Sequence, residues 1–174
     1  MSFLTVKKFL RCVLWASALS AVVFAGSAGA VDVFPAFSSR SSTGEPVTDA
    51  LFADARLTMV NLWATWCPPC RSEMPDLGAL GRSMPEGSQL VGILLDAGER
   101  GAMDDAQKIL TEANAGFLQI LPAKAMEPVL EEIDAIPTTI FVDSKGRIVG
   151  EPLVGSRSEK EYRAAVEKIL NSIP

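Results

Sequence analysis

The sequence of 174 residues has no histidine and only three cysteines, one of them within the first thirty positions. Without an imidazole side chain, the chain cannot form a Cys/His zinc site or a hydrolase triad that needs a histidine base. The two remaining thiols are too few for a four-cysteine metal site, and one CxxC motif without a second ligand cluster is a weak metal signal. We therefore expect neither a metal nor another cofactor.

The chain also has few basic residues, with 16 Lys and Arg against 21 Asp and Glu and a net charge of −5. Three of the basic residues lie within the first thirty positions, so the remainder is more acidic still. An acidic domain lacks the basic surface that binds nucleic acids. Residues 31–174 have the length of one ordinary domain, and we expect it to act as a monomer without a nucleic-acid partner.

Residues 1–30 have the composition of a secretory signal peptide. A short basic start precedes an uncharged apolar run, and Ala28-Gly29-Ala30 fits an A-x-A cleavage site. Residues 12–31 are uncharged and about long enough to span a bilayer, so an uncleaved membrane anchor is the alternative. The small and polar residues within the run favour cleavage. Both interpretations predict export and an extracytoplasmic location.

The predicted elements alternate between strands and helices, which indicates an α/β fold with a central mixed sheet flanked by helices. Apolar and β-branched runs predict strands at 56–65 and 89–96, a short strand at 116–121 and a hairpin at 138–154. Helical spacing predicts helices after Cys67 and at 104–113, 126–133 and 158–170. Residues 31–50 are rich in Ser, Gly, Pro and Thr and are interpreted as an entry segment, with a turn at Thr43–Val47.

The C-terminal helix has the clearest boundary signal. Ser158 and Glu161 have the spacing of a capping box, which predicts that the helix begins at this point. We expect its buried stripe to consist of Ala164, Ala165, Ile169 and Leu170.

The stretch WATWCPPCRSEMP carries the main chemical signal, because Cys67 and Cys70 flank Pro68 and Pro69 where a strand gives way to a helix. A disulfide that closes so short a loop contributes little loop entropy, which favours a reactive pair over a structural one. At a helix N-terminus, free N–H groups and the helix dipole favour a thiolate on Cys67. Cys70, buried one turn later, can then attack a mixed disulfide formed by Cys67.

Two tryptophans close to the cysteines and a proline far along the chain are further candidates for the site. Trp63 is equally suited to exclude water from the thiols or to pack in the core, whereas Trp66, beside Cys67, favours a role at the site. Ile136-Pro137 precedes a predicted strand. The proline is either an edge device or a cis-proline turn that faces the thiols and exposes the Ile136 backbone to a substrate strand.

The segments NLWATWCPPCRSEMP and IPTTIFVDSKGRIVG together resemble the TlpA/ResA-like thioredoxin-fold thiol–disulfide oxidoreductases, over residues 34–172. The resemblance implies an extracytoplasmic thioredoxin-like domain that reduces disulfides in partner proteins, often apocytochrome c. A membrane electron carrier would re-reduce it. By this resemblance, Cys67 is the nucleophile, Cys70 the resolving thiol and Pro137 the cis-proline. We expect the substrate to contact Trp66, Pro68, Pro69 and Ile136.

Glu73 matches an acidic residue that similar family members keep three positions after the second cysteine. A carboxylate one helical turn beyond Cys70 would raise thiol pKa values by repulsion, and it can accept a proton when Cys70 reacts. Ordinary thioredoxins instead keep a buried aspartate on the preceding strand, where this chain has Asn61. The alternative interpretation of Glu73 is an ordinary glutamate on the helix surface.

The leading interpretation is a protein-disulfide reductase, with three alternatives. A thiol-dependent peroxidase of the peroxiredoxin type would need a threonine three residues before its reactive cysteine, where this chain has Ala64. A non-catalytic, redox-sensitive binding module would use the Ile136 edge and the thiols without turnover. An oxidase would use the same residues in the opposite direction, because the reduction potential decides which way electrons flow.

Overall fold

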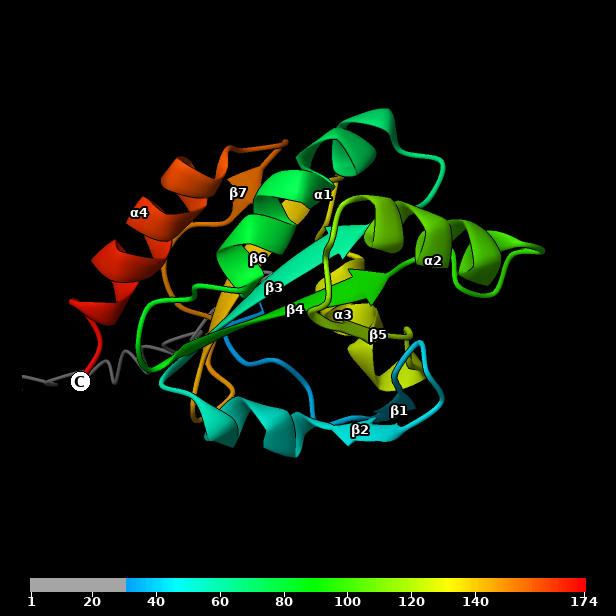
Figure 1. Cartoon of the computed structure of the whole chain (residues 1–174). Helices are drawn as coiled ribbons and strands as arrows, with labels where there is room; N and C mark the ends of the chain where they lie inside the picture. Colours follow the sequence, from blue (N-terminus) through cyan, green and yellow to red (C-terminus); the bar gives the residue numbers. More distant parts are fainter. Residues whose placement is uncertain (1–30) are drawn as a thin grey trace, which may run out of the picture.

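The computed structural model describes residues 31–174, and the predicted signal peptide lies outside the described residues. A five-stranded sheet with the order β5-β4-β3-β6-β7 forms its centre (Figure 1). The strands are β3 (Leu57–Trp63), β4 (Ser88–Leu94), β5 (Leu118–Ile120), β6 (Thr138–Asp143) and β7 (Leu153–Val154). β3 pairs parallel with β4 and antiparallel with β6, so the predicted mixed sheet is confirmed.

The central strands are apolar because both faces of the sheet are covered. Every residue of β3 and β6 is buried, as expected for strands with no solvent-facing side. Successive side chains alternate between the faces. Met59 and Trp63 therefore join one hydrophobic cluster, and Val60 and Leu62 join the other.

Three helices cover one face of the sheet: α1 (Pro68–Gly81), α2 (Ala102–Glu112) and α4 (Glu159–Leu170) (Figure 1). Their apolar side chains pack with those of β3 in a single cluster that also contains Cys67 and Cys70. The predicted helix at 104–113 is α2, which begins two residues earlier. None of the helices within residues 31–174 is long and apolar enough to cross a membrane.

The opposite face is covered by shorter elements that the sequence indicated only in part. β1 (Ser38–Arg40) and β2 (Pro46–Thr48) form a hairpin around the predicted turn, followed by the 3-10 helix η1 (Asp49–Asp54). The helix predicted at 126–133 is shorter, because a 3-10 turn η2 (Lys124–Met126) leads into α3 (Glu127–Leu130). Phe34, Phe37 and Phe52 pack edge to face beneath the sheet.

The buried stripe of α4 differs from the prediction. The capping box of Ser158 and Glu161 is present, but Ala164 is exposed and Ala165 only partly buried. The buried residues of the helix are Tyr162, Val166, Ile169 and Leu170. These positions recur at helical spacing on one face, and their larger side chains remove more apolar surface from water than alanine does.

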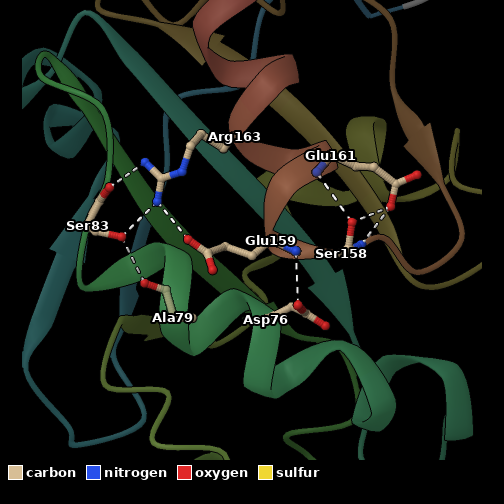
Figure 2. Close-up of polar contacts among 7 residues, drawn as sticks. All are labelled: Asp76, Ala79, Ser83, Ser158, Glu159, Glu161 and Arg163. Atoms are coloured by element: carbon tan, nitrogen blue, oxygen red, sulfur yellow. Dashed lines mark hydrogen bonds and ion pairs between the residues drawn. The ribbon is translucent and has the colours of Figure 1, made fainter.

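Polar contacts join α4 to α1 along the rim of this packed face (Figure 2). The Asp76 carboxylate accepts a hydrogen bond of 3.0 Å from the backbone N–H of Glu159, in the first turn of α4. The Arg163 guanidinium donates to the carbonyl and hydroxyl oxygens of Ser83 and to the Glu159 carboxylate, at 2.7–2.8 Å. These contacts hold the inner face of α4 against the helix that carries the cysteines.

Candidate active site

The two cysteines form a disulfide at the start of α1. Cys67 is the N-cap residue of the helix, and Cys70 lies in its first turn with a Cα–Cα distance of 5.3 Å. Pro68 and Pro69 occupy the first two helical positions, where a missing N–H breaks no intrahelical bond. Cys70 is fully buried and Cys67 is only 2% exposed. The predicted burial of the second thiol is confirmed.

The helix start offers Cys67 fewer N–H groups than an ordinary helix start would. Cys70 N–H donates to Cys67 Sγ at 3.3 Å. Pro68 and Pro69 have no N–H, so Cys70 is the first residue of the helix that can donate one. The backbone therefore stabilises a Cys67 thiolate less than the helix position alone predicts.

The loop before β6 brings a second segment to the disulfide. The Ile136–Pro137 peptide bond is cis, and the Ile136 carbonyl oxygen lies 3.7 Å from Cys67 Sγ. The Pro137 carbonyl accepts a hydrogen bond of 2.8 Å from Gly155 N–H, which attaches this loop to the segment after β7. The predicted cis-proline turn facing the thiols is confirmed. The alternative, a proline that only protects the edge of a sheet, is wrong, because the strand that follows Pro137 is β6, and β6 lies inside the sheet between β3 and β7.

The two tryptophans have different surroundings. Trp63 is fully buried in the cluster that holds both cysteines, and its indole N–H donates to Gln119 Oε1 at 2.9 Å. Core packing is therefore its structural role. Trp66 is 63% exposed beside Cys67, so it is not part of the buried core. The predicted substrate contacts are all accessible to solvent: Trp66, Pro68 and Pro69 are exposed, and Ile136 is partly exposed. Their role in substrate binding stays a prediction.

Glu73 is buried, with only 2% of its surface exposed, so the interpretation as a surface glutamate is wrong. Its carboxylate lies one helical turn beyond Cys70 and accepts three hydrogen bonds. Asn61 Nδ2 donates to Oε1 at 2.9 Å, whereas the Tyr162 hydroxyl and the Arg157 backbone N–H donate to Oε2 at 2.7 Å and 3.3 Å. All three donors favour the ionised form.

Burial nevertheless raises the pKa of Glu73 above its ordinary value, although the hydrogen bonds from Tyr162, Asn61 and Arg157 oppose the rise. A carboxyl group whose pKa is raised toward the working pH exchanges protons more readily than an ordinary glutamate. Glu73 is therefore a buried carboxyl group with a raised pKa, one helical turn from Cys70.

Asn61 occupies the strand position at which ordinary thioredoxins have an acid. Its amide NH₂ donates both to Glu73 and to Thr139 Oγ1, the latter at 3.1 Å. An amide does not ionise near neutral pH, so it cannot act as an acid or a base there. Asn61 therefore links Glu73 to the neighbouring strand β6 without replacing it as an acid.

The sequence did not reveal two further contacts around the site. Tyr162 reaches Glu73 from α4, and its only signal was a large side chain at the correct helical spacing. Asp96, a buried residue two positions beyond the end of β4, accepts hydrogen bonds from the backbone N–H and the hydroxyl of Thr65. This contact fixes the residue two positions before Cys67, and an acid at the end of a buried strand was its only signal.

The side chains give no sign of a bound metal. Within residues 31–174, no group of three or more Cys, Asp or Glu side chains is arranged to hold a metal ion. The groups that surround the disulfide are the two sulfur atoms, a buried carboxyl group and the partly exposed Ile136 backbone.

Comparison with known proteins agrees with this geometry. A family model described as Redoxin matches residues 29–168. The chain belongs to this family. It is 31% identical to the thiol:disulfide interchange protein HelX of Rhodobacter capsulatus over 126 residues, which cover 72% of this chain and 67% of HelX. It is 32% identical to the thiol-disulfide oxidoreductase ResA of Oceanobacillus iheyensis over 91 residues, covering 52% and 45%.

A solved structure has the same fold. A thiol:disulfide interchange protein of the thioredoxin family from Chlorobium tepidum superposes with a TM-score of 0.67 at 26% identity, over 83% of this chain and 99% of that one. The predicted thioredoxin-like fold and the resemblance to TlpA/ResA-like proteins are thus confirmed. The chain is a thiol–disulfide oxidoreductase with a CxxC pair at Cys67 and Cys70.

Proposed function

We propose that this protein is an extracytoplasmic protein-disulfide reductase in which Cys67 attacks the substrate and Cys70 resolves the mixed disulfide. One observation carries the proposal: the Cys67–Cys70 pair begins α1, and Cys67 Sγ lies 3.7 Å from the Ile136 carbonyl oxygen. A substrate strand that pairs with the Ile136 backbone would bring its own disulfide to the attacking sulfur.

The reaction starts from the reduced pair. The Cys67 thiolate attacks one sulfur of the substrate disulfide, a Cys67–substrate disulfide forms, and the first substrate thiolate leaves and takes a proton from solvent. Cys70 then gives its proton to Glu73, and its sulfur attacks Cys67 Sγ. The second substrate thiolate leaves, so the substrate gains two electrons and the Cys67–Cys70 disulfide is restored.

Reduction is the favoured direction because little in the site stabilises a thiolate. A dithiol becomes a strong oxidant when its reduced form is stabilised. Here the Cys67 sulfur accepts a helix N–H from Cys70 alone, since the Arg71 N–H donates to the Cys67 carbonyl, and the chain contains no histidine. The buried Glu73 carboxylate near Cys70 would repel a thiolate further. These features support a reducing pair.

The substrate class and the electron donor follow from the resemblance to TlpA/ResA-like proteins. We propose that the monomeric protein reduces a disulfide in an exported protein, such as apocytochrome c or an oxidised surface enzyme. A membrane protein with a dithiol would return two electrons to the pair. The signal-peptide composition of residues 1–30 supports this location, either after cleavage or with the segment as an anchor.

Reduction of insulin disulfides in the presence of dithiothreitol tests the proposal. Cys67→Ser should reduce the rate to the uncatalysed background, because the attacking sulfur is gone. When the pre-reduced protein is mixed with insulin without dithiothreitol, Cys70→Ser should instead accumulate a mixed disulfide through Cys67, because no second thiol resolves it. Mass spectrometry of the trapped adduct identifies the linked cysteine.

The same assay separates the alternatives. A non-catalytic binding module would show no turnover in the wild-type protein. A peroxidase would consume hydrogen peroxide faster than it reduces insulin. A trapped adduct through Cys70 would contradict the assignment of the nucleophile.

A further inference from the structure

Tyr162 is the only tyrosine of the chain, and its hydroxyl group is buried against a carboxylate. The hydroxyl donates to Glu73 Oε2 at 2.7 Å, across 89 residues of sequence. This bond is shorter than those from Asn61, at 2.9 Å, and from Arg157 N–H, at 3.3 Å. Tyr162 is therefore the closest donor to the proposed proton acceptor of the resolving step.

We propose that Tyr162 is a positioning residue for the resolving step: its hydroxyl holds the Glu73 carboxylate in place and stabilises the ionised form that accepts the Cys70 proton. This inference rests on the proposed function, because it takes Glu73 as that acceptor. Nothing in it requires Tyr162 to touch the sulfur atoms or the substrate.

Packing alone does not explain a hydroxyl group at this position. A phenylalanine ring would fill nearly the same space, and a buried hydroxyl costs free energy unless it forms a hydrogen bond. A bond to a charged carboxylate is stronger than one between neutral groups. Burial and the neighbouring Glu73 both raise the pKa of Tyr162, so its phenol stays protonated and remains a donor whenever Glu73 is ionised.

Other groups face Glu73 from each neighbouring element. Asn61 on β3 is neutral and donates, Thr139 on β6 lies beyond it, and Cys70 is on the same helix. Arg157, before α4, donates its backbone N–H, while its guanidinium donates to backbone carbonyl oxygens of the same loop, including that of Val154. Among the hydrogen bonds that lower the pKa of Glu73, the one from Tyr162 has the largest effect.

The substitution Tyr162→Phe removes this bond and keeps the ring. Glu73 should then titrate at a higher pH than in the wild-type protein, because a donor to its ionised form is lost. A hydrogen bond to a charged group corresponds to about a tenfold change in equilibrium. At a pH below the titration midpoint, the ionised fraction of Glu73 should therefore fall about tenfold.

Carbon-13 NMR of labelled glutamate side chains in the oxidised protein measures this midpoint directly, and Glu73→Gln identifies the resonance by its loss. The resolving rate is measured separately, as release of a thiol leaving group from a preformed Cys67 mixed disulfide against pH. In Tyr162→Phe this rate should fall about tenfold at the same low pH and approach the wild-type rate at high pH. In a Glu73→Gln background, Tyr162→Phe should change the pH profile no further.

Thr58→Val is the matched control. Thr58 is a fully buried residue of β3 whose hydroxyl accepts a hydrogen bond from Gln89, and it is not among the hydrogen-bond partners of Glu73. This variant also removes a buried hydroxyl, but it should leave the Glu73 midpoint and the resolving profile unchanged.

An unchanged Glu73 midpoint in Tyr162→Phe would overturn the proposal, even if that variant is less stable. A shifted midpoint with an unchanged resolving profile would equally remove the positioning role. If Tyr162→Phe does not fold, the Cζ resonance of the single tyrosine in the wild-type protein should shift at the Glu73 midpoint, and its failure to do so counts against the proposal. A wild-type protein that reduces no disulfide would refute the proposed function, whereas the NMR titration would still test the link between Tyr162 and Glu73.

Discussion

Glu73 is held by three hydrogen-bond donors and still has a raised pKa, because the loss of water on burial outweighs them. An ionised glutamate at this position opposes folding in a way that a surface glutamate does not. A glutamate at this position fits a chemical role, since a neutral side chain of the same size would avoid this cost.

The raised pKa of Glu73 predicts that the stability of the protein depends on pH. An unfolded glutamate has a pKa of about 4.3, and burial raises the pKa of Glu73 in the folded state. Between the two values the folded protein binds more protons than the unfolded chain, so its free energy of unfolding falls as pH rises. Glu73→Gln removes this contribution. The free energy of unfolding of the wild type minus that of the variant should decrease as pH rises above about 4, and should level off above the folded pKa.

Urea unfolding of both proteins across a pH series measures this difference. The oxidised forms should be compared, so that the thiols do not titrate. A difference that stays constant with pH would mean that the Glu73 pKa is the same in the folded and unfolded states.

At the scale of elements, the strands with continuous apolar runs could be predicted from sequence. The predicted strands at 56–65 and 89–96 contain β3 and all but the first residue of β4, because burial on both faces leaves an unbroken hydrophobic signal. The hairpin of β1 and β2 was missed, since each strand has three residues and no buried one. The capping box fixed the start of α4, but propensity did not reveal which face it buries.

In the candidate site, too, the residues of local motifs could be predicted from sequence, whereas the contacts between distant elements could not. Cys67, Cys70 and Pro137 belong to two local motifs and could be found from sequence. The contact between Tyr162 and Glu73 joins α4 to α1, and no local pattern specifies which side chains meet when two helices pack. The hydrogen-bond network around Glu73 therefore could not be predicted from sequence.

Close packing of α1 against the end of α2 leads to a prediction at Gly78. A Cβ atom there would lie 2.7 Å from the carbonyl oxygen of Ala113 and 2.9 Å from that of Asn114. These are backbone atoms, which cannot turn aside as a flexible side chain can. Gly78→Ala should therefore lower the free energy of unfolding by about 1–3 kcal/mol, as measured by denaturant unfolding.

Gly81→Ala on the same helix is the control. Its new Cβ would make ordinary contacts of 3.5 Å with Phe117. Because alanine favours helix more than glycine does, this variant should be neutral or more stable by up to about 1 kcal/mol. Equal effects of the two substitutions would mean that helix propensity, and not the contact with α2, decides the outcome.

Across the whole molecule, the site lies where four segments meet: the end of β3, the start of α1, the loop before β6 and the loop between β7 and α4. Backbone hydrogen bonds join the last two, through Gly155 N–H and the Pro137 carbonyl. The loop after β7 also reaches Glu73 through Arg157 N–H. Because these segments lie far apart in the sequence and meet around the disulfide, we expect the stability of the fold to depend on the redox state of the cysteines.

The direction of that dependence tests the direction of the reaction. If folding stabilises the disulfide more than the dithiol, the folded pair is more reducing than the same pair in the unfolded chain, and each 30 mV of that difference corresponds to about 1.4 kcal/mol of stability. Little in this site stabilises a thiolate, since Pro68 and Pro69 lack N–H groups and Glu73 is buried close by. We therefore expect the oxidised protein to unfold at a higher guanidinium concentration than the dithiothreitol-reduced protein at pH 7.

The double variant Cys67→Ser, Cys70→Ser should not respond to dithiothreitol, which controls for effects of the reductant itself. A reduced form that is more stable than the oxidised form would instead indicate an oxidase, because the dithiol would then be the favoured product of the folded protein.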